Sequence, residues 1–394
     1  MKSLSRGEHN VPDSKARTEP TPSAFKDFFN RKLVEEMAHH LHRAWPGFDK
    51  KAFTAAALHN FSALELKQRA HQIAAALGAR LPADVPKALR IVTGALRPLG
   101  PDGELHPDQG KGIAGWAILP FGEYVAANGL GHLKDSLATL RELTIRSTSE
   151  FAIRPFIARY PEETLRVLAR WAKDKNAHVR RLVSEGTRPR LPWGMQLKAF
   201  VKDPAPILPL LELLRDDPSD YVRRSVANSI NDIAKDHPEL VAALASRWLK
   251  EASPERARLV RHACRTLIKA GHRPTLEALG YAPDAKVTLE KFALSPAALT
   301  FGNALTLKVR LVSTARTAQK IVLDYVVHHR KKSGSSAKVF KWKAFTLAPG
   351  ETITLSRKHA IRPITTRVYY PGAHKVEVMA NGKVLAEKRF TLEM

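Results

Sequence analysis

The fold is decided by three stretches, HVRRLVSEG (178–186), YVRRSVANSINDIAK (221–235) and RLVRHACRTLIKAG (258–271). They align on a common Val-Arg pair, whose valines stand 43 and 38 residues apart. Each stretch is preceded by a segment with an apolar stripe at helical spacing, namely PEETLRVLARWAKD, APILPLLELLRDD and PELVAALASRWLKEA. The pattern predicts a pair of helices that repeats along the chain.

This period is typical of HEAT-like repeats. One helix pair cannot bury its own apolar face, so successive pairs must stack into a curved solenoid whose concave side is lined by one helix of each pair. Apolar residues continue at helical spacing through residues 24–281, which we predict to be one all-helical domain. The Val-Arg-Arg helices place cations beside the buried valines, so we expect a basic concave face if these helices line it.

After Gly280 the period changes to that of strands. ALTLKVRLV (304–312) alternates apolar and polar residues, and similar short segments bring the total to about seven strands within residues 282–394. The Asn381-Gly382 pair between the last two segments indicates a tight hairpin. This count and size predict an all-β, immunoglobulin-like sandwich. The chain is therefore multidomain, with a solenoid followed by a sandwich.

Composition points to a polyanionic partner. The 64 Lys and Arg residues outnumber 38 Asp and Glu residues, for a formal charge of +26. A single cysteine, Cys264, allows no internal disulfide and indicates a reducing compartment. Residues 1–23 are polar and Pro-rich, which predicts a disordered leader, and no apolar stretch is long enough for a membrane span. We expect a cytoplasmic, nucleoid-associated protein without a membrane partner.

Half of this charge lies in the predicted sandwich. Residues 282–394 hold 20 Lys and Arg against 7 Asp and Glu. The stretch HHRKKSGSSAK (328–338) is a Gly/Ser loop between two strands, with Arg330, Lys331 and Lys332 at its base. Such a loop suits contact with nucleic-acid phosphates, although a flexible, solvated hairpin is the alternative. The excess of positive charge favours nucleic acid.

The sequence gives little support for a metal site or a nucleotide-binding site. The sixteen histidines include no His-Glu-x-x-His motif or cluster at metal-ligand spacing, and the Gly-rich stretch 100–112 matches neither a P-loop nor a dinucleotide motif. We predict no metal and no cofactor.

The remaining candidates for chemistry are carboxylates and aromatics. Glu185 stands in the last turn of a helix, where a carboxylate costs about 0.3–1 kcal/mol unless a cation offsets it. Arg188 and Arg190 could do so, or they could hold phosphates while Glu185 faces a cationic ligand. The structural explanation for Glu150 is a glutamate at the start of a helix, and the one for Asp232 is a solvated surface aspartate. The sequence around Glu150 and Asp232 does not by itself assign a function to either residue.

Trp193 follows in the same stretch, SEGTRPRLPW, where prolines 189 and 192 stiffen the chain. It is either a stacking platform or wedge for a base, or a core anchor.

Three stretches carry a resemblance to a known family: SEGTRPRLPW, SEFAIRPF and the amino-terminal FKDFFNRKLVEEMAHHLHRAWPGFDKKAF. Over roughly residues 24–280 the chain resembles the AlkC family of DNA alkylation-repair glycosylases, relatives of the AlkD proteins. One branch of that family carries an immunoglobulin-like extension, which the predicted sandwich resembles.

The resemblance implies a monofunctional DNA glycosylase that removes N3-alkylated bases, chiefly 3-methyladenine and 3-methylcytosine, without a metal and without deep base flipping. It implies that Glu150, Glu185 and Asp232 are catalytic carboxylates. Their negative charge would stabilise the oxocarbenium-like sugar and position water. Alkylated double-stranded DNA is then the partner, and a monomer suffices to clamp it. Resemblance and charge together give the predicted DNA contacts: Arg154, Arg181, Arg188, Arg190, Trp193, Arg223, Arg330, Lys331 and Lys332.

Two other hypotheses remain at this point. A non-catalytic HEAT-like scaffold could bind nucleic acid or an acidic protein, which explains the charge but gives the acid-bearing loop no purpose. An RNA-binding module also fits the charge.

Overall fold

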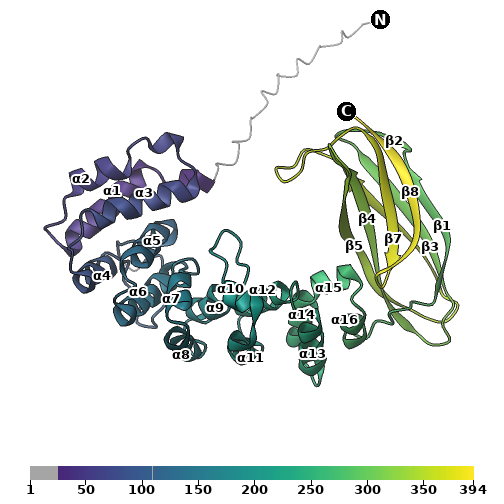
Figure 1. Ribbon diagram of the computed structural model, residues 1–394, viewed down its shortest axis with the longest axis horizontal. Coiled ribbons are helices and arrows are strands. Elements are labelled where there is room, and N and C mark those ends of the chain that lie inside the picture. The colour runs from purple at the N-terminus through teal and green to yellow at the C-terminus, as the bar shows by residue number, and fades with distance from the viewer. Residues whose placement is uncertain (1–24, 109) are drawn as a thin grey trace, which may run out of the picture.

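The computed structural model describes residues 25–108 and 110–394 and shows a helical solenoid followed by a β-sandwich (Figure 1). The predicted leader, residues 1–23, lies outside the described residues. The predicted boundary between the domains, 281/282, falls in the link between the last helix and the first strand. The helices are α1 (Arg31–Ala44), α2 (Lys50–Ala57), α3 (Leu66–Gly78), α4 (Val85–Gly94), α5 (Ile118–Asn128), α6 (Leu133–Arg146), α7 (Arg154–Arg159), α8 (Pro161–Trp171), α9 (Ala177–Gly186), α10 (Lys198–Lys202), α11 (Leu208–Leu214), α12 (Asp220–Ile233), α13 (Pro238–Leu249), α14 (Pro254–Ala263), α15 (Arg265–Ala270) and α16 (Arg273–Ala278).

The solenoid forms an arc with an inner and an outer row of helices. Helices α8, α11 and α13 lie on the outer side, and α9, α12 and α14 line the concave side (Figure 1). The aligned valines of these inner helices, Val179, Val222 and Val260, are all buried in one apolar core that extends through the solenoid. The structure thus confirms the predicted repeat and shows that the Val-Arg helices line its concave face (Figure 1).

Local sequence fixes both ends of α9. At its start, the side chain of Asn176 accepts hydrogen bonds from the backbone N–H groups of His178 (2.9 Å) and Val179 (3.3 Å). At its end, a Cβ added to Gly186 would lie 2.8 Å from the side chain of Ile153, so only glycine allows this close packing. The last turn of α9 therefore packs directly against the segment before α7.

The loop that follows α9 rises into the concave space, where it is drawn in teal between α9 and α10 (Figure 1). It carries Trp193, which adopts a left-handed backbone conformation with φ of 64° and is 68% exposed. Of the two fates predicted for this tryptophan, the core anchor is wrong.

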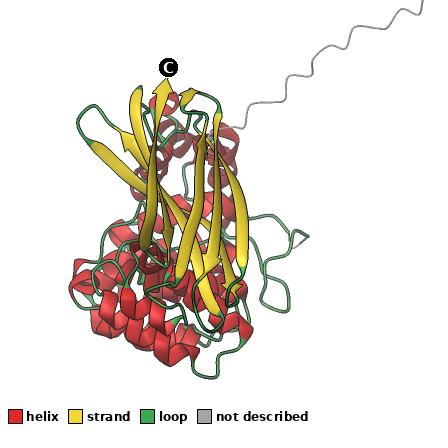
Figure 2. Cartoon of the chain, turned by 90° about the vertical axis from the view of Figure 1, so that its right-hand side faces the viewer, coloured by secondary structure: helices red, strands yellow, loops and turns green. Residues whose placement is uncertain are grey.

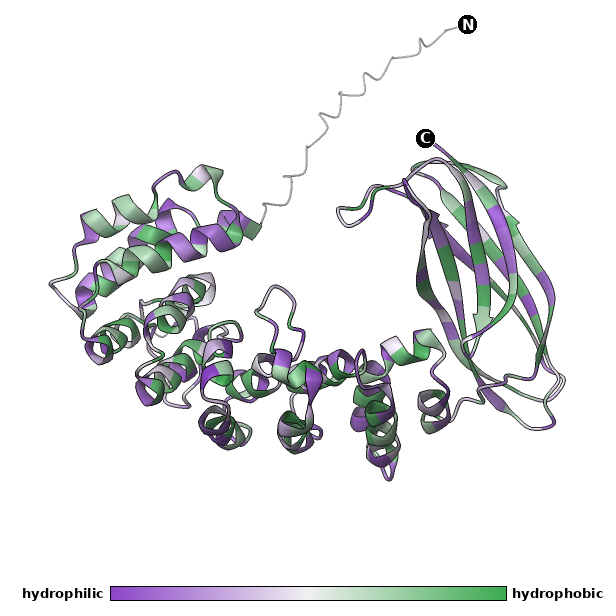
Figure 3. Cartoon of the chain, viewed as in Figure 1, coloured by the Kyte–Doolittle hydropathy of each residue, from purple (hydrophilic) through white to green (hydrophobic). Residues whose placement is uncertain are grey.

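The sandwich contains two sheets packed face to face (Figure 2). One has the strand order β1-β3-β6, and the other β2-β8-β7-β4-β5. Side chains alternate between a buried and a solvated face along the strands, as their hydropathy shows (Figure 3). The strands are β1 (Val287–Ser295), β2 (Ala298–Thr300), β3 (Ala304–Ser313), β4 (Gln319–Arg330), β5 (Ser335–Leu347), β6 (Thr352–Ala360), β7 (Gly372–Ala380) and β8 (Lys383–Glu393).

Two details bear on the predicted strands. The short β2, which pairs in parallel with β8, was not predicted, because three residues are too few for an alternating pattern. The predicted hairpin between β7 and β8 is confirmed: Ala380 pairs with Lys383, and Asn381 and Gly382 both have positive φ, as this turn requires.

That hairpin also lies against the link between the two domains. The side-chain amide of Asn381 donates to the carbonyl of Ala282 (2.7 Å), and its Oδ1 accepts from the N–H of Val322 (2.7 Å). Val322 belongs to β4 but packs into the apolar core of the solenoid. The outer face of the five-stranded sheet is therefore turned toward the concave side of the arc (Figure 1).

Candidate active site

Glu185 lies in the last turn of α9, with only 5% of its surface exposed. Its Oε1 accepts a hydrogen bond from Arg188 Nη1 (2.6 Å) and lies 3.5 Å from Arg181 Nη2. Its Oε2 accepts from the hydroxyl of Ser225 (2.7 Å). The positive charge of Arg188 therefore offsets the negative charge of Glu185 at the end of the helix. This is one of the two roles considered for Arg188 from the sequence.

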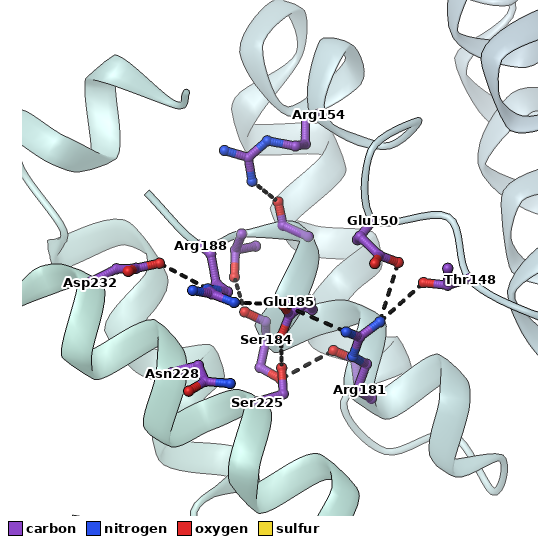
Figure 4. Close-up of polar contacts among 12 residues, drawn as sticks. Thr148, Glu150, Arg154, Arg181, Ser184, Glu185, Arg188, Ser225, Asn228 and Asp232 are labelled. Atoms are coloured by element: carbon purple, nitrogen blue, oxygen red, sulfur yellow. Dashed lines mark hydrogen bonds and ion pairs between the residues drawn. The ribbon is translucent and has the colours of Figure 1, made fainter. Parts of the chain in front are cut away.

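Asp232 lies in the last turn of α12 and is also buried. Its Oδ2 accepts from Arg188 Nε (2.8 Å), and its Oδ1 accepts from Lys235 Nζ (3.0 Å). Arg188 thus bridges two carboxylates from adjacent inner helices (Figure 4). Burial disfavours the charge of Arg188, but the hydrogen bond to Asp232 and the charge of Glu185 outweigh it and raise the pKa of Arg188.

Glu150 lies in the turn between α6 and α7. Its Oε2 accepts from Arg181 Nη1 (3.2 Å), which also donates to the hydroxyl of Thr148 (3.0 Å). Burial raises the pKa of Glu150, and the charge of Arg181 opposes that rise. A carboxylate with a raised pKa accepts a proton more readily than an ordinary one.

Arg181 and Arg188 link the three predicted catalytic acids into one chain of contacts, Glu150–Arg181–Glu185–Arg188–Asp232 (Figure 4). The guanidinium of Arg181 also lies over the ring of Tyr221, 5.3 Å from its centroid. The fold therefore brings together acids that are 35 and 47 residues apart in the sequence.

A cavity of about 360 Å³ opens beside Glu150. Its walls are largely apolar, with Trp116, Phe151 and Trp193 among them, and Lys67 and Thr148 add polar groups. Lys67 Nζ donates to the backbone carbonyl of Trp193, which ties the loop to α3. Neither Trp116 nor Phe151 was predicted as a site residue. Phe151 directly follows Glu150 in SEFAIRPF, so its motif was a usable signal, but Trp116 is brought here only by the fold.

Arg154 corrects the predicted set of DNA contacts. It is fully buried and donates to the carbonyls of Gly186 (2.8 Å) and Met195 (2.5 Å). Burial, together with the nearby charge of Arg188, lowers the pKa of Arg154 to about 10. It holds both ends of the Trp193 loop, so it has no exposed surface with which to contact a phosphate.

The other predicted arginines of the solenoid are also paired within the protein. Arg188 is buried between its two acids, so its predicted contact with phosphate is likewise corrected to an internal role. Arg190 donates to both carboxylate oxygens of Asp236 (2.8 Å each). Arg223 donates to the backbone carbonyls of Asp217 (2.6 Å) and Pro218 (2.9 Å). The sequence shows the cations of the trough but not their carboxylate and carbonyl partners.

Both domains of the chain are similar to known proteins. The family described as "DNA alkylation repair enzyme" matches residues 144–267, and the C-terminal Ig-like domain of the uncharacterised protein YhaZ matches residues 288–394. YhaZ of Bacillus subtilis (strain 168) is 36% identical over 361 residues, which cover 91% of this chain and 96% of YhaZ. The structure of Pseudomonas fluorescens alkylpurine DNA glycosylase AlkC, bound to DNA containing an abasic site analog, aligns with a TM-score of 0.85 at 38% identity. That alignment covers 94% of this chain and all of the other.

The chain belongs to the AlkC family of DNA alkylation-repair enzymes.

In this AlkC-family chain the three predicted cations of the sandwich lie at its end far from the link. Arg330, Lys331 and Lys332 are all exposed at the turn between β4 and β5. His328, Lys375 and Arg389 line a hollow of about 350 Å³ beside them on the outer face of the same sheet, and these three were not predicted. They lie on three different strands, so only the register reveals that they are neighbours.

Neither a metal cluster nor a membrane helix occurs in the described part of this AlkC-family member. Within residues 25–108 and 110–394, no group of three or more His, Cys, Asp or Glu side chains is arranged to hold a metal ion. Over the same residues, no helix is long and apolar enough to cross a membrane.

Proposed function

We propose that the protein is a monofunctional DNA glycosylase that hydrolyses the N-glycosidic bond of cationic N3-alkylated bases in duplex DNA. The proposed substrates are 3-methyladenine and 3-methylcytosine, and the proposed working form is a cytoplasmic monomer without a cofactor. Support comes from the AlkC structure, which covers 94% of this chain and whose ligand is DNA with an abasic site analog. An abasic site is what remains after a glycosylase has removed a base.

The observation that carries this proposal is the chain of contacts among three acids and two arginines on the concave side of the solenoid (Figure 4). Alkylation at N3 makes the base cationic and a good leaving group, so the enzyme need not protonate it. The barrier then lies in the positive charge that develops on the sugar, which nearby carboxylates stabilise. Buried carboxylates do this strongly because water screens them little.

The contacts favour different roles for the acids. Both oxygens of Glu185 and both of Asp232 accept hydrogen bonds or ion pairs from side chains, so these two carboxylates are held in place. Glu150 accepts from Arg181 through one oxygen and borders the cavity beside Trp193. Its raised pKa suits a group that takes a proton from water. We therefore propose that Glu150 takes a proton from the attacking water and that Glu185 stabilises the positive charge on the sugar.

The surroundings of the acids suit DNA that is bent rather than a base that is flipped deeply. Trp193 stands exposed on a loop that rises from the concave face, where it can stack on or wedge against an opened base step. The β4–β5 turn, which carries Arg330, Lys331 and Lys332, projects toward the same concave space (Figure 1), so these cations can contact phosphates from the other side. Bending exposes the lesion at a cost of a few kcal/mol, which is least where alkylation has weakened pairing.

The test measures base release from dimethyl-sulfate-treated duplex DNA by chromatography. We expect the wild-type protein to release 3-methyladenine, and Glu185→Gln and Glu150→Gln to bind the DNA with little change while releasing almost none. Glu162→Gln, an exposed acid on the outer helix α8, is the matched control and should keep full activity. A wild-type protein that binds methylated DNA but frees no base would instead support the non-catalytic scaffold.

A further inference from the structure

Two buried hydroxyls stand behind Glu185. Ser225, on α12, donates to Glu185 Oε2 (2.7 Å), and Ser184, on α9, lies 2.7 Å from the hydroxyl of Ser225 (Figure 4). Both serines are nearly or fully buried, with 3% of Ser225 and none of Ser184 exposed. We propose that Ser225, supported by Ser184, is a positioning residue that fixes the carboxylate of Glu185 for the reaction. This inference rests on the proposed function and deepens it.

The direction of the hydrogen bonds is set by chemistry. An ionised carboxylate only accepts, so the single hydroxyl proton of Ser225 is directed to Glu185. Ser184 can then donate its own proton either to the hydroxyl of Ser225 or to the carbonyl of Arg181, 3.1 Å away. When it donates to Ser225, the two hydroxyls form a chain that ends on the carboxylate and polarises the last bond toward it.

Among the described residues, Ser225 is the side chain that hydrogen-bonds to Oε2 of Glu185. Arg188 and Arg181 both approach Oε1 of Glu185, at 2.6 and 3.5 Å, whereas Ser225 is the side chain bonded to Oε2. Arg181 and Arg188 belong to α9 and to the loop that follows it, whereas Ser225 belongs to α12. The hydrogen bond from Ser225 therefore restrains the second oxygen from a different helix, so that both oxygens of the carboxylate are held in place.

The repeat shows that packing does not require a hydroxyl here. Ser225 stands three residues after the aligned Val222, and the same position of the other two aligned helices holds Leu182 and Ala263. All three positions are buried, and the other two are apolar. A serine at an apolar position buries a polar group, which is costly unless that group is hydrogen-bonded. At Ser225 the hydrogen bond to Glu185 offsets this cost.

The chain offers a matched control for this serine. Ser229 lies one helical turn later on α12, is fully buried, and its hydroxyl has no hydrogen-bond partner in the described part of the protein. Ser225→Ala and Ser229→Ala therefore remove the same atom from the same helix at the same burial. They differ in whether that atom contacts Glu185.

The experiment measures the single-turnover rate of 3-methyladenine release and, separately, the dissociation constant for abasic-analog duplex DNA. We expect Ser225→Ala to lower the rate about 10- to 100-fold, as for loss of a hydrogen bond to a charged group. Its dissociation constant should stay within about 2-fold of wild type, since the serine is too buried to contact DNA. Ser229→Ala should change neither quantity, and Ser225→Thr, which keeps the hydroxyl, should restore most of the rate.

The outcomes separate the two proposals. If the wild-type protein releases no alkylated base, the proposed function fails. If it is active and Ser225→Ala reacts as fast as Ser229→Ala, or Ser225→Thr is as slow as Ser225→Ala, the positioning role is wrong and the glycosylase activity stands. Thermal unfolding of all three variants shows whether a slow rate reflects unfolding, and a folded, slow Ser225→Ala with an unchanged dissociation constant supports the role.

Discussion

Arg188 Nε lies 2.8 Å from Asp232 Oδ2, although the two residues are 44 positions apart. The same guanidinium donates to Glu185, so a single buried cation serves two buried carboxylates. Removing one partner of a buried ion pair leaves uncompensated charge in a poorly screened environment. The arrangement therefore predicts a strong effect on stability as well as on activity.

We expect Arg188→Met to lower the free energy of unfolding by about 3–5 kcal/mol. Urea denaturation followed by circular dichroism measures the change. Arg190→Ala is the comparison, because Arg190 and Asp236 form a partly exposed pair and its loss should alter stability little. Adding Asp232→Asn to Arg188→Met should recover part of the loss. Equal midpoints for the Arg188 and Arg190 variants would contradict the bridging role.

The sequence predicted the solenoid and the sandwich because both follow from periodic patterns. The Val-Arg alignment located the inner helices, and the alternation after Gly280 located all strands but β2. The grouping of Glu150, Glu185 and Asp232 came from family resemblance, since their spacing alone reveals no common surface. Composition also could not show that Arg154 is buried, because a buried and an exposed arginine contribute equally to the net charge.

Arg181 provides a prediction about pH. Burial raises the pKa of Glu150, and the positive charge of Arg181 counteracts that rise. Arg181→Gln removes the charge, so the ionised form of Glu150 becomes less favourable and its pKa should rise further. If Glu150 must be ionised to take a proton from water, activity is lost as pH falls through this pKa. The acid limb of the pH–rate profile should therefore move to higher pH.

The measurement is the single-turnover rate of Arg181→Gln between pH 5 and 8. Arg224→Gln, which changes an exposed cation on the inner helix α12, is the control and should keep the wild-type limb. An acid limb that stays in place in Arg181→Gln, with a lower plateau only, would mean that Glu150 does not control the rate.

Trp193 offers a way to separate stability from activity. Its φ of 64° is unfavourable for any residue with a Cβ, and its side chain is largely exposed. Trp193→Gly should relieve about 1 kcal/mol of backbone strain while removing the exposed ring that we propose contacts DNA. We expect an unchanged or higher unfolding temperature together with at least 10-fold slower base release. Slower release accompanied by a clear drop in unfolding temperature would point to a packing role instead.

The cations on the sandwich should contribute to the salt dependence of DNA binding. Replacing Arg330, Lys331 and Lys332 with Ala should lower the slope of log K against log salt by up to about 0.9 for each phosphate that the protein no longer neutralises. The control replaces Lys291, Lys308 and Lys358, exposed cations on the three-stranded sheet that faces away from the concave side. Fluorescence anisotropy at several salt concentrations measures both slopes. Equal slopes would assign this end of the sandwich to another partner.

The joint between the domains leads to the last prediction. Gly271 at the end of α15 and Gly382 in the β7–β8 turn touch so closely that a Cβ on Gly382 would lie 2.2 Å from the Cα of Gly271. Neither backbone can give way without moving its domain, so Gly382→Ala should force the joint open. Gly350→Ala is the control, because Gly350 also has a positive φ, but a Cβ added there would meet no atom of the described residues within 4 Å apart from its chain neighbours.

Both alanine variants carry the cost of a left-handed backbone, about 1 kcal/mol, so any difference between them measures the joint. We expect trypsin to cut the link at Lys286 faster in Gly382→Ala than in Gly350→Ala, and DNA affinity to fall in Gly382→Ala alone. The reason is that a clamp with a fixed angle places its two surfaces on DNA without first ordering them, whereas a loose joint must lose that freedom on binding. If the two variants bind DNA equally well, the contact between Gly271 and Gly382 does not set the geometry of the clamp.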